Sequence, residues 1–449
     1  MIEEEDKMKD KYLLDCIQTY KRRLVWSIQA DNRCKMQEKI LTFQMYKNFL
    51  LFGKQYEKKW RRLQKKYNKV NMIGVEFVSF GETLPRLFTM LQDFGREDKR
   101  VLNVVLPIFC EAHIGGIHNK RIFDMFERHL YFVRESNIDF WAYVVANHAE
   151  SINKKYFYKY NARRPEYISV KLGIPLLPFT NEQVREAEAK MKHMGIKGGF
   201  VCLHSRENRV KELEWNVNLL GKTSCRDCDI NSFGKASLYM ENLGYQSIRM
   251  GKYEVKKCSI PGVIDYSNNY YDELMDFYLL SKCKFLIGSD SGLSTSAGFW
   301  GRPVLITNVV PICYGFESCP NTGVDMYIPK KFWSEKEKRY LNLYEMLDIS
   351  NDCDIYDSRY QKRRIVLEDN TQDEILEATK EMNAKLDGCW VTSKEEEADR
   401  KQYWRIMDLW KKNHSYVLPR RKYRGYVMLF QEISYSYLKN NRYLLDVDF

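Results

Sequence analysis

The chain has 449 residues, of which 44% are apolar, and a formal net charge of +12. This length predicts two or three domains, and the apolar content supports buried cores, which excludes an intrinsically disordered protein. No segment approaches the roughly 20 apolar residues that cross a bilayer, and the acidic start lacks the apolar core of a secretory signal. A cytoplasmic protein is therefore expected.

The positive charge is concentrated near the start of the chain. Residues 21–70 contain 15 Lys or Arg and three acidic residues, an excess equal to the whole net charge. Residues 1–70 contain no proline, and aromatic and leucine side chains recur at helical spacing from Phe49 to Tyr67. We expect a basic helical extension over residues 1–70. Its basic face is either solvated or docks on an anionic membrane surface or partner, which would place the protein at the inner face of the membrane. No motif supports a nucleic-acid partner.

An α/β pattern follows over residues 71–180. Two apolar strands are predicted at Ile73–Phe80 and Val101–Cys110, with a helix at Leu84–Phe94 between them. A glycine-containing loop with His113 precedes a helix predicted at Asn119–Phe132. Apolar strands alternating with helices indicate a parallel sheet covered on both faces, so this segment is expected to be a Rossmann-like domain.

A second α/β pattern covers residues 181–335. After a helix at 181–194, strands are predicted at Phe200–His204, Tyr245–Met250, Val263–Tyr266, Lys284–Gly288 and Pro303–Thr307. The helices between them are predicted at Asn231–Leu243, Tyr271–Ser281 and Thr295–Trp300. Five strands with short crossovers predict a second Rossmann-like domain. Residues 336–449 are expected to form a helical C-terminal region.

Polar residues follow the strands of this second domain, and ligands bind beyond the carboxyl ends of an open parallel sheet. The candidate residues at or just after the ends of these strands are His204, Arg206, Arg249, Gly251, Asp265, Ser289, Asp290, Ser291 and Gly292. The loop from Gly288 to Gly292 joins a strand to a helix and would present backbone N–H groups and hydroxyls to a diphosphate. Arg206 and Arg249 could each add a charge-assisted contact. The alternative is structural, because Ser, Asp and Gly are also ordinary cap and turn residues.

The run from Phe200 to Pro311 resembles a family of bacterial glycosyltransferases encoded among surface-polysaccharide genes. The matching pieces include Val-Cys-Leu-His-Ser-Arg at 201–206, Cys-Arg-Asp-Cys-Asp-Ile at 225–230, Ser-Asp-Ser-Gly-Leu at 289–293 and Ile-Pro-Lys-Lys at 328–331. The likeness covers most of residues 70–449. More distantly, the His-x-Arg strand end and the Ser-Asp-Ser loop are similar to those of fucosyltransferases of the GT-B type.

The resemblance implies a GT-B-like fold, with an acceptor domain at 71–180 and a nucleotide-sugar domain at 181–335. It implies that Arg206 steadies the leaving diphosphate and that Ser289, Asp290 and Ser291 hold the nucleotide. The expected activity moves a sugar, a hexose or deoxyhexose, from a nucleotide-sugar donor to a glycan or glycolipid acceptor. His113, Asp227 and His204 are the candidates for the general base.

No metal or cofactor is expected. The single CxxC of Cys225 and Cys228 lacks a second ligand pair, and the Asp227-x-Asp229 motif precedes a predicted helix. Two other functions remain open: a non-catalytic GT-B-like scaffold that recruits partners through its basic helix, and a nucleotide-sugar epimerase. The sugar, the acceptor and the stereochemical outcome are not specified by these patterns.

Overall fold

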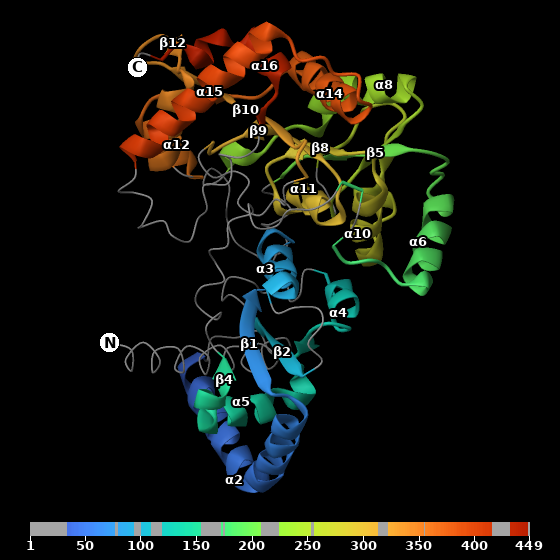
Figure 1. The fold of residues 1–449 in the computed structure, drawn as a ribbon, viewed down its shortest axis with the longest axis vertical. Coiled ribbons are helices and arrows are strands. Elements are labelled where there is room, and N and C mark those ends of the chain that lie inside the picture. The colour runs from blue at the N-terminus through green and yellow to red at the C-terminus, as the bar shows by residue number, and fades with distance from the viewer. Residues whose placement is uncertain are drawn as a thin grey trace. The chain divides into compact units, whose positions relative to one another are not determined.

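The chain folds into two compact units, Met1–Arg163 and Arg164–Phe449, each built around a parallel sheet (Figure 1). The computed structural model describes residues 34–76, 80–93, 100–108, 119–153, 172–173, 176–207, 224–252, 256–312, 322–353, 355–414 and 432–447. In this part of the chain, no helix combines the length and apolar character that spanning a membrane requires.

The first unit has four parallel strands in the order β3-β2-β1-β4. Its strands are β1 (Lys69–Glu76), β2 (Val101–Ile108), β3 (Tyr131–Phe132) and β4 (Ile152–Asn153). Its helices are α2 (Cys34–Lys66), α3 (Phe80–Asp93), α4 (Arg121–Phe126) and α5 (Ile138–Asn147), with short 3-10 turns η1 (Glu135–Asn137) and η2 (Ala149–Ser151).

The helix α2 is part of the core of this unit. Trp60 is completely buried and packs edge-on against Trp141 of α5, with ring centroids 6.5 Å apart. Tyr56 meets Phe140 in the same way at 6.1 Å. The periodic aromatic residues of the sequence therefore form one face that joins α2 to α5, because an apolar stripe at helical spacing must be covered.

Two predictions for this unit are wrong in detail. The first strand begins at Lys69 and ends at Glu76, before the predicted end at Phe80, which instead opens α3. The helix expected over Asn119–Phe132 ends at Phe126, and Tyr131–Phe132 forms the edge strand β3. Phe132 pairs with Val105 of β2, so a tertiary contact overrides the local helical pattern.

The second unit has a seven-stranded parallel sheet in the order β14-β10-β9-β8-β5-β6-β7. Its strands are β5 (Phe200–His204), β6 (Gln246–Arg249), β7 (Ile264–Asp265), β8 (Leu286–Ser289), β9 (Val304–Val309), β10 (Met326–Pro329) and β14 (Glu432–Ile433). Its helices up to β9 are α6 (Asn181–His193), α8 (Gly234–Asn242), α9 (Tyr266–Asn269), α10 (Glu273–Lys282) and α11 (Gly292–Ser296), with 3-10 turns η5 (Ser224–Arg226), η6 (Ile230–Phe233) and η7 (Ala297–Trp300).

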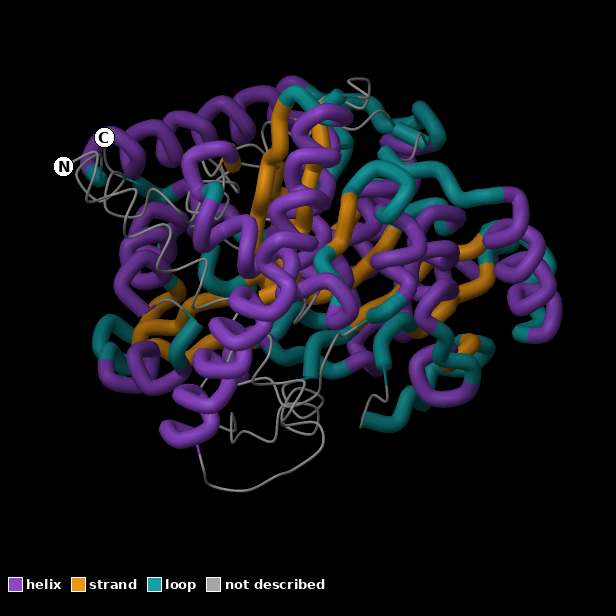
Figure 2. The backbone as a smooth tube through the Cα atoms, turned by 90° about the horizontal axis from the view of Figure 1, so that it is seen from below, coloured by secondary structure: helices purple, strands orange, loops and turns teal. Residues whose placement is uncertain are grey.

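The order of these strands is that of a Rossmann fold. Numbered from β5, the first six strands run 3-2-1-4-5-6 across the sheet, so the direction of winding reverses between β5 and β8. The helices α8 and α14 (Gln372–Leu386) contact each other on one face, and α6 and α10 contact each other on the opposite face (Figure 1). Helices, drawn in purple, flank the strands, drawn in orange, in Figure 2. The predicted α/β class with parallel sheets in two units is confirmed.

The region after residue 330 is less purely helical than predicted. It contains α12 (Leu343–Cys353), α13 (Asp357–Lys362), α14 (Gln372–Leu386), α15 (Lys394–Asn413), α16 (Tyr435–Asn440) and η9 (Arg442–Leu445). It also contains an antiparallel sheet of β11 (Lys331–Ser334), β12 (Arg339–Tyr340) and β13 (Ile365–Glu368). Its last strand, β14, joins the seven-stranded sheet beside β10. These strands are short, and the pairing of Glu432 with Met326 spans over a hundred residues, which local patterns do not report.

Candidate functional site

The carboxyl ends of β5 and β8 meet at the point where the sheet reverses. His204 is in register with Gly288, and the backbone N–H of Arg206 donates to Oγ of Ser289 over 2.7 Å. The two strand ends that the sequence analysis singled out are thus joined directly. In an open α/β sheet this crevice is where a ligand binds, so it is the candidate site.

Gly288 lets these two strand ends approach each other. A Cβ atom built at this position would lie 2.6 Å from Oγ of Ser294 and 2.8 Å from the carbonyl oxygen of His204. Both distances are shorter than real Cβ contacts. The carboxyl end of β8 therefore requires a glycine at position 288 because of close packing.

Arg206 is the main charged group of the site. Its guanidinium is 7% exposed and forms an ion pair through Nη1 with the carboxylate of Asp227, which is 27% exposed. Burial, followed by the nearby Arg226 cation, lowers the pKa of Arg206 to about 10. The group therefore remains positively charged at neutral pH, as a contact to a diphosphate would require.

Two further cations lie in the same cluster. Nη2 of Arg226 donates to the backbone oxygen of Asp290 over 3.0 Å and pairs with its carboxylate at the same distance. Nζ of Lys330, directly after β10, lies 3.0 Å from the backbone oxygen of Asp227 and 2.5 Å from Oδ1 of Asp369. Neither Arg226 nor Lys330 was predicted as a site residue. The available signal was their place in the Cys-Arg-Asp-Cys and Ile-Pro-Lys-Lys pieces of the resemblance.

Two polar atoms of the cluster are buried and make no hydrogen bond within the described residues. They are Oγ of Ser205, which follows β5, and Nε of Arg226. Buried polar groups are almost always paired in folded proteins. Two such atoms beside the sheet reversal are consistent with a site that completes its hydrogen bonds on a polar ligand.

His204 is held in its neutral form. Its Nδ1 lies 3.2 Å from the backbone oxygen of Met250, so this nitrogen carries the hydrogen and Nε2 has the lone pair. Burial, together with the cations of Arg249 and Arg206, lowers the pKa of His204 to about 4, although the Met250 hydrogen bond acts in the opposite direction. A base this weak accepts a proton poorly at neutral pH.

Arg249 is fully buried in a separate ion cluster. Its Nη2 donates to Glu207 over 3.2 Å and its Nη1 to Asp265 over 3.1 Å. Glu207 also accepts from the backbone N–H of Lys256 at 3.0 Å. The structure thus brings the predicted residues Arg249 and Asp265 together, and their contacts tie the ends of β5, β6 and β7 to one another.

The remaining predicted residues divide into three groups. Oγ of Ser291 accepts from the backbone N–H of Ser294 over 3.1 Å and caps α11. Gly251 has a φ of 135°, which a residue with a side chain rarely adopts, and Gly292 opens α11. His113 lies outside the described residues, so its role stays a prediction.

The CxxC cysteines are buried thiols. Burial raises the pKa of each thiol to about 12. The Asp357 carboxylate adds to this effect at Cys225, and a hydrogen bond with Ser289 opposes it at Cys228. Both thiols are therefore protonated at neutral pH. Among the described residues, no three His, Cys, Asp or Glu side chains are arranged to hold a metal ion.

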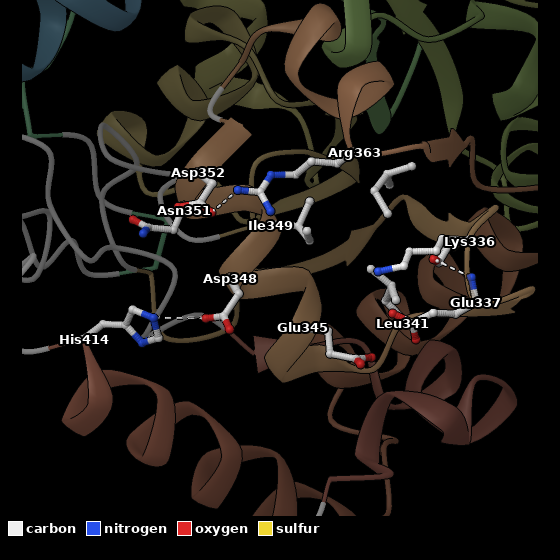
Figure 3. A pocket seen from close by; sticks show the side chains of 12 residues that line it. Lys336, Glu337, Leu341, Glu345, Asp348, Ile349, Asn351, Asp352, Arg363 and His414 are labelled. Atoms are coloured by element: carbon white, nitrogen blue, oxygen red, sulfur yellow. Dashed lines mark hydrogen bonds and ion pairs between the residues drawn. The ribbon is translucent and has the colours of Figure 1, made fainter.

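A cavity of about 580 Å³ lies elsewhere in this unit, between α12, the β11–β13 sheet and the end of α15 (Figure 3). Asp348 faces His414 there, with 3.1 Å between Oδ1 and Nε2, and Asp352 pairs with Arg363 at 2.5 Å. None of the predicted site residues lines this cavity. This cavity is not part of the candidate site at the sheet reversal.

Comparisons with known proteins find only remote likenesses. No family profile matches the sequence, and no curated protein is significantly similar to it. A solved structure of glycosyl transferase family 9 from Veillonella parvula aligns over 71% of this chain and 98% of its own, at 10% identity and a TM-score of 0.42. The ADP-heptose LPS heptosyltransferase II of E. coli aligns over 66% and 97%, at 13% identity and a TM-score of 0.33. Likenesses this remote do not place the chain in a family, and the likeness to fucosyltransferases stays a prediction.

Proposed function

We propose that the chain is a glycosyltransferase that moves a sugar from a nucleotide-sugar donor to a hydroxyl of a glycan or glycolipid, in the cytoplasm and as part of surface-polysaccharide synthesis. The observation that carries the proposal is the convergence of a buried arginine and a Gly-Ser-Asp-Ser loop on the reversal point of a Rossmann sheet. In such sheets this crevice holds nucleotides. The sequence resemblance adds the class of reaction.

Arg206 is the group that we assign to the leaving diphosphate. A guanidinium can bind a phosphate through two parallel hydrogen bonds, and a site shielded from water strengthens each of them. Arg226 and Lys330 place two more positive charges within the same cluster. Each of these three cations is paired with a carboxylate here, and each could turn to the charge that develops on the leaving group, which is why we propose metal-independent transfer.

Asp227, Arg249 and Asp265 receive different roles in this proposal. Asp227 holds the Arg206 guanidinium and is the more exposed partner, so it is our first candidate for a proton acceptor among the described residues. Arg249 and Asp265 hold the strand ends in place and are positioning residues, since the Arg249 side chain is completely buried. His204 is a poorer candidate for the base because of its lowered pKa.

The first test is thermal-shift screening of the full chain against GDP, UDP, CMP and their sugar conjugates. A rise in Tm with the nucleotides of one base, lost in Arg206→Ala, is the expected result. Arg302→Ala is the matched control. Arg302 lies at the amino end of β9, where its Nε donates to the backbone oxygen of Ser281 over 2.8 Å. It should lower Tm but keep the nucleotide-induced rise.

Other outcomes would point to the two other functions. A folded chain that responds to no nucleotide would favour the scaffold, and an Arg206→Ala variant that keeps the full response would refute the diphosphate contact. Conversion of a bound nucleotide sugar to its epimer without any acceptor would indicate an epimerase. Transfer that survives chelation of divalent cations is expected if the three cations replace a metal.

A further inference from the structure

The outward side of α2 combines exposed cations with exposed leucines. Lys47, Lys54, Lys58, Arg61, Arg62 and Lys65 all lie on it and are solvent-exposed. Leu50 and Leu51 lie among them with 88% and 62% of their surface exposed. We call this set of eight residues the basic face of α2. At 1.5 Å per residue it extends about 27 Å along the helix.

The orientation of the basic face is set by the opposite side of the helix. Phe49 meets Tyr143 of α5 at 5.6 Å between ring centroids, and Trp60 meets Trp141. Asn48 donates to Asp139 of α5 over 2.9 Å. Successive residues of a helix are rotated by about 100°, so contacts that hold one side of α2 against α5 direct the opposite side away from α5. Within the first unit the basic face is therefore presented as a rigid surface.

Among the described side chains of α2, one carboxylate pairs with this face, and it does so through Arg61 alone. The one acidic residue from 47 to 66 is Glu57. It accepts from Arg61 at 2.8 Å, lies 2.7 Å from Nε2 of His148, and accepts from Tyr143 at 3.3 Å. These contacts lower the pKa of Glu57, and the Arg61 hydrogen bond is the largest cause, followed by the His148 hydrogen bond. The Glu57 carboxylate is therefore already paired at the edge of the α2–α5 contact.

The mixture of charges and leucines favours one kind of partner. Phosphates of any anionic polymer attract lysines, but a leucine gains nothing from a phosphate backbone. An anionic bilayer satisfies both, because cations sit among the headgroups while leucines enter the acyl boundary. We propose that the basic face of α2 docks the protein on an anionic lipid bilayer.

The purpose of docking rests on the proposed function, since a glycolipid acceptor is presented at a membrane surface. The docking itself does not, because it uses no residue of the nucleotide site. Vesicle binding by the Arg206→Ala variant should equal that of the natural chain. A failure of nucleotide binding and a failure of docking can therefore be told apart.

The experiment is sedimentation of the full chain with phosphatidylcholine vesicles, with and without phosphatidylglycerol, at low and high salt. We expect binding only to the vesicles that contain phosphatidylglycerol, weakened by salt. Leu50→Ala/Leu51→Ala and, separately, Lys54→Gln/Lys58→Gln should each reduce the partition coefficient by about tenfold.

Matched controls come from exposed residues of the second unit. Leu238→Ala/Leu243→Ala removes two leucines that are 57% and 46% exposed, and Lys192→Gln/Lys197→Gln removes two exposed lysines. Neither should change vesicle binding. The proposal is overturned if the natural chain does not bind, if the Leu50→Ala/Leu51→Ala variant binds as well as the natural chain, or if a DNA duplex outcompetes the vesicles with no dependence on the leucines.

Discussion

At the scale of single residues, the site depends on charges that are buried and paired. Arg206 with Asp227 and Arg226 with Asp290 are each held by a partner from another segment. Removing one partner of such a pair leaves an uncompensated charge in a poorly solvated place, which costs more than the pair contributes. Substitutions here affect folding as well as binding, so each needs a control of similar burial.

His204 should make the stability of the protein depend on acid pH. Its pKa falls from 6.5 in the unfolded chain to about 4 in the fold, so the unfolded state binds a proton first. The stabilising contribution is complete above pH 6.5 and is lost as pH falls toward 4, with a total of about 3 kcal/mol. Urea unfolding of the natural chain and of His204→Gln across this range measures it. The two pH profiles should diverge, and parallel profiles would contradict the assignment.

Gly288→Ala should destabilise the protein by about 1–3 kcal/mol, because the added methyl meets Oγ of Ser294 and the backbone of His204 at under 3 Å. Gly198→Ala is the control, since a Cβ there meets nothing within 4 Å. Chemical denaturation of both variants gives the comparison. Equal stability of the two variants would show that the end of β8 relaxes freely.

At the scale of elements, one buried carboxylate of α14 binds the start of α16, next to the pairing of β14 with β10. Glu381 of α14 accepts from Oγ of Ser434 at 2.7 Å and from the backbone N–H groups of Tyr435 and Ser436 at 3.1 and 2.9 Å. It also pairs with Lys385 at 2.9 Å and Arg400 at 3.3 Å. These contacts satisfy the first N–H groups of α16, which no residue within the helix can accept.

Glu381→Ala should therefore cost about 3–5 kcal/mol, because it leaves buried cations and N–H groups without their acceptor. Burial alone would raise the pKa of Glu381, but the Lys385 charge and the hydrogen bonds lower it on balance. The carboxylate thus contributes stability that is lost as pH falls through its lowered pKa. Glu377→Ala is the control, because the Glu377–Lys380 pair is 43% exposed on both sides and worth little. Similar losses in the two variants, measured by thermal unfolding, would contradict this role.

At the scale of the whole molecule, each unit completes its own sheet. Every pairing of the seven-stranded sheet joins residues of the second unit, including β14 near the C-terminus. The nucleotide site proposed above also lies within that unit.

A fragment of residues 164–449 is therefore expected to fold alone, with a cooperative thermal transition. It should keep the nucleotide-induced rise in Tm of the full chain and lose vesicle binding. Circular dichroism, thermal shift and sedimentation test the three parts. A fragment that stays unfolded, or that folds but binds vesicles like the full chain, would contradict the independence of the two units.

The residue patterns alone determined most of the second unit. Phe200–His204 was predicted to the residue, and the other four predicted strands were located within about two residues at either end, because continuous apolar runs between turn residues signal buried parallel strands. They also singled out Arg206 and the Ser289–Ser291 loop as candidates, since the ends of strands are readable from the same runs, and their role in a site stays a prediction. The strand β3 was predicted as part of a helix and β14 was missed, because two residues carry no periodicity.

Only the tertiary structure decided which polar groups share a site. Arg206 and Asp227 are 21 positions apart, and Lys330 lies more than a hundred positions from Asp227, yet all three converge through the strand order. It also separated Arg249 from them by burying it between Glu207 and Asp265. Pairing between distant segments depends on how the sheet is wound, and composition and spacing along the chain do not contain that order.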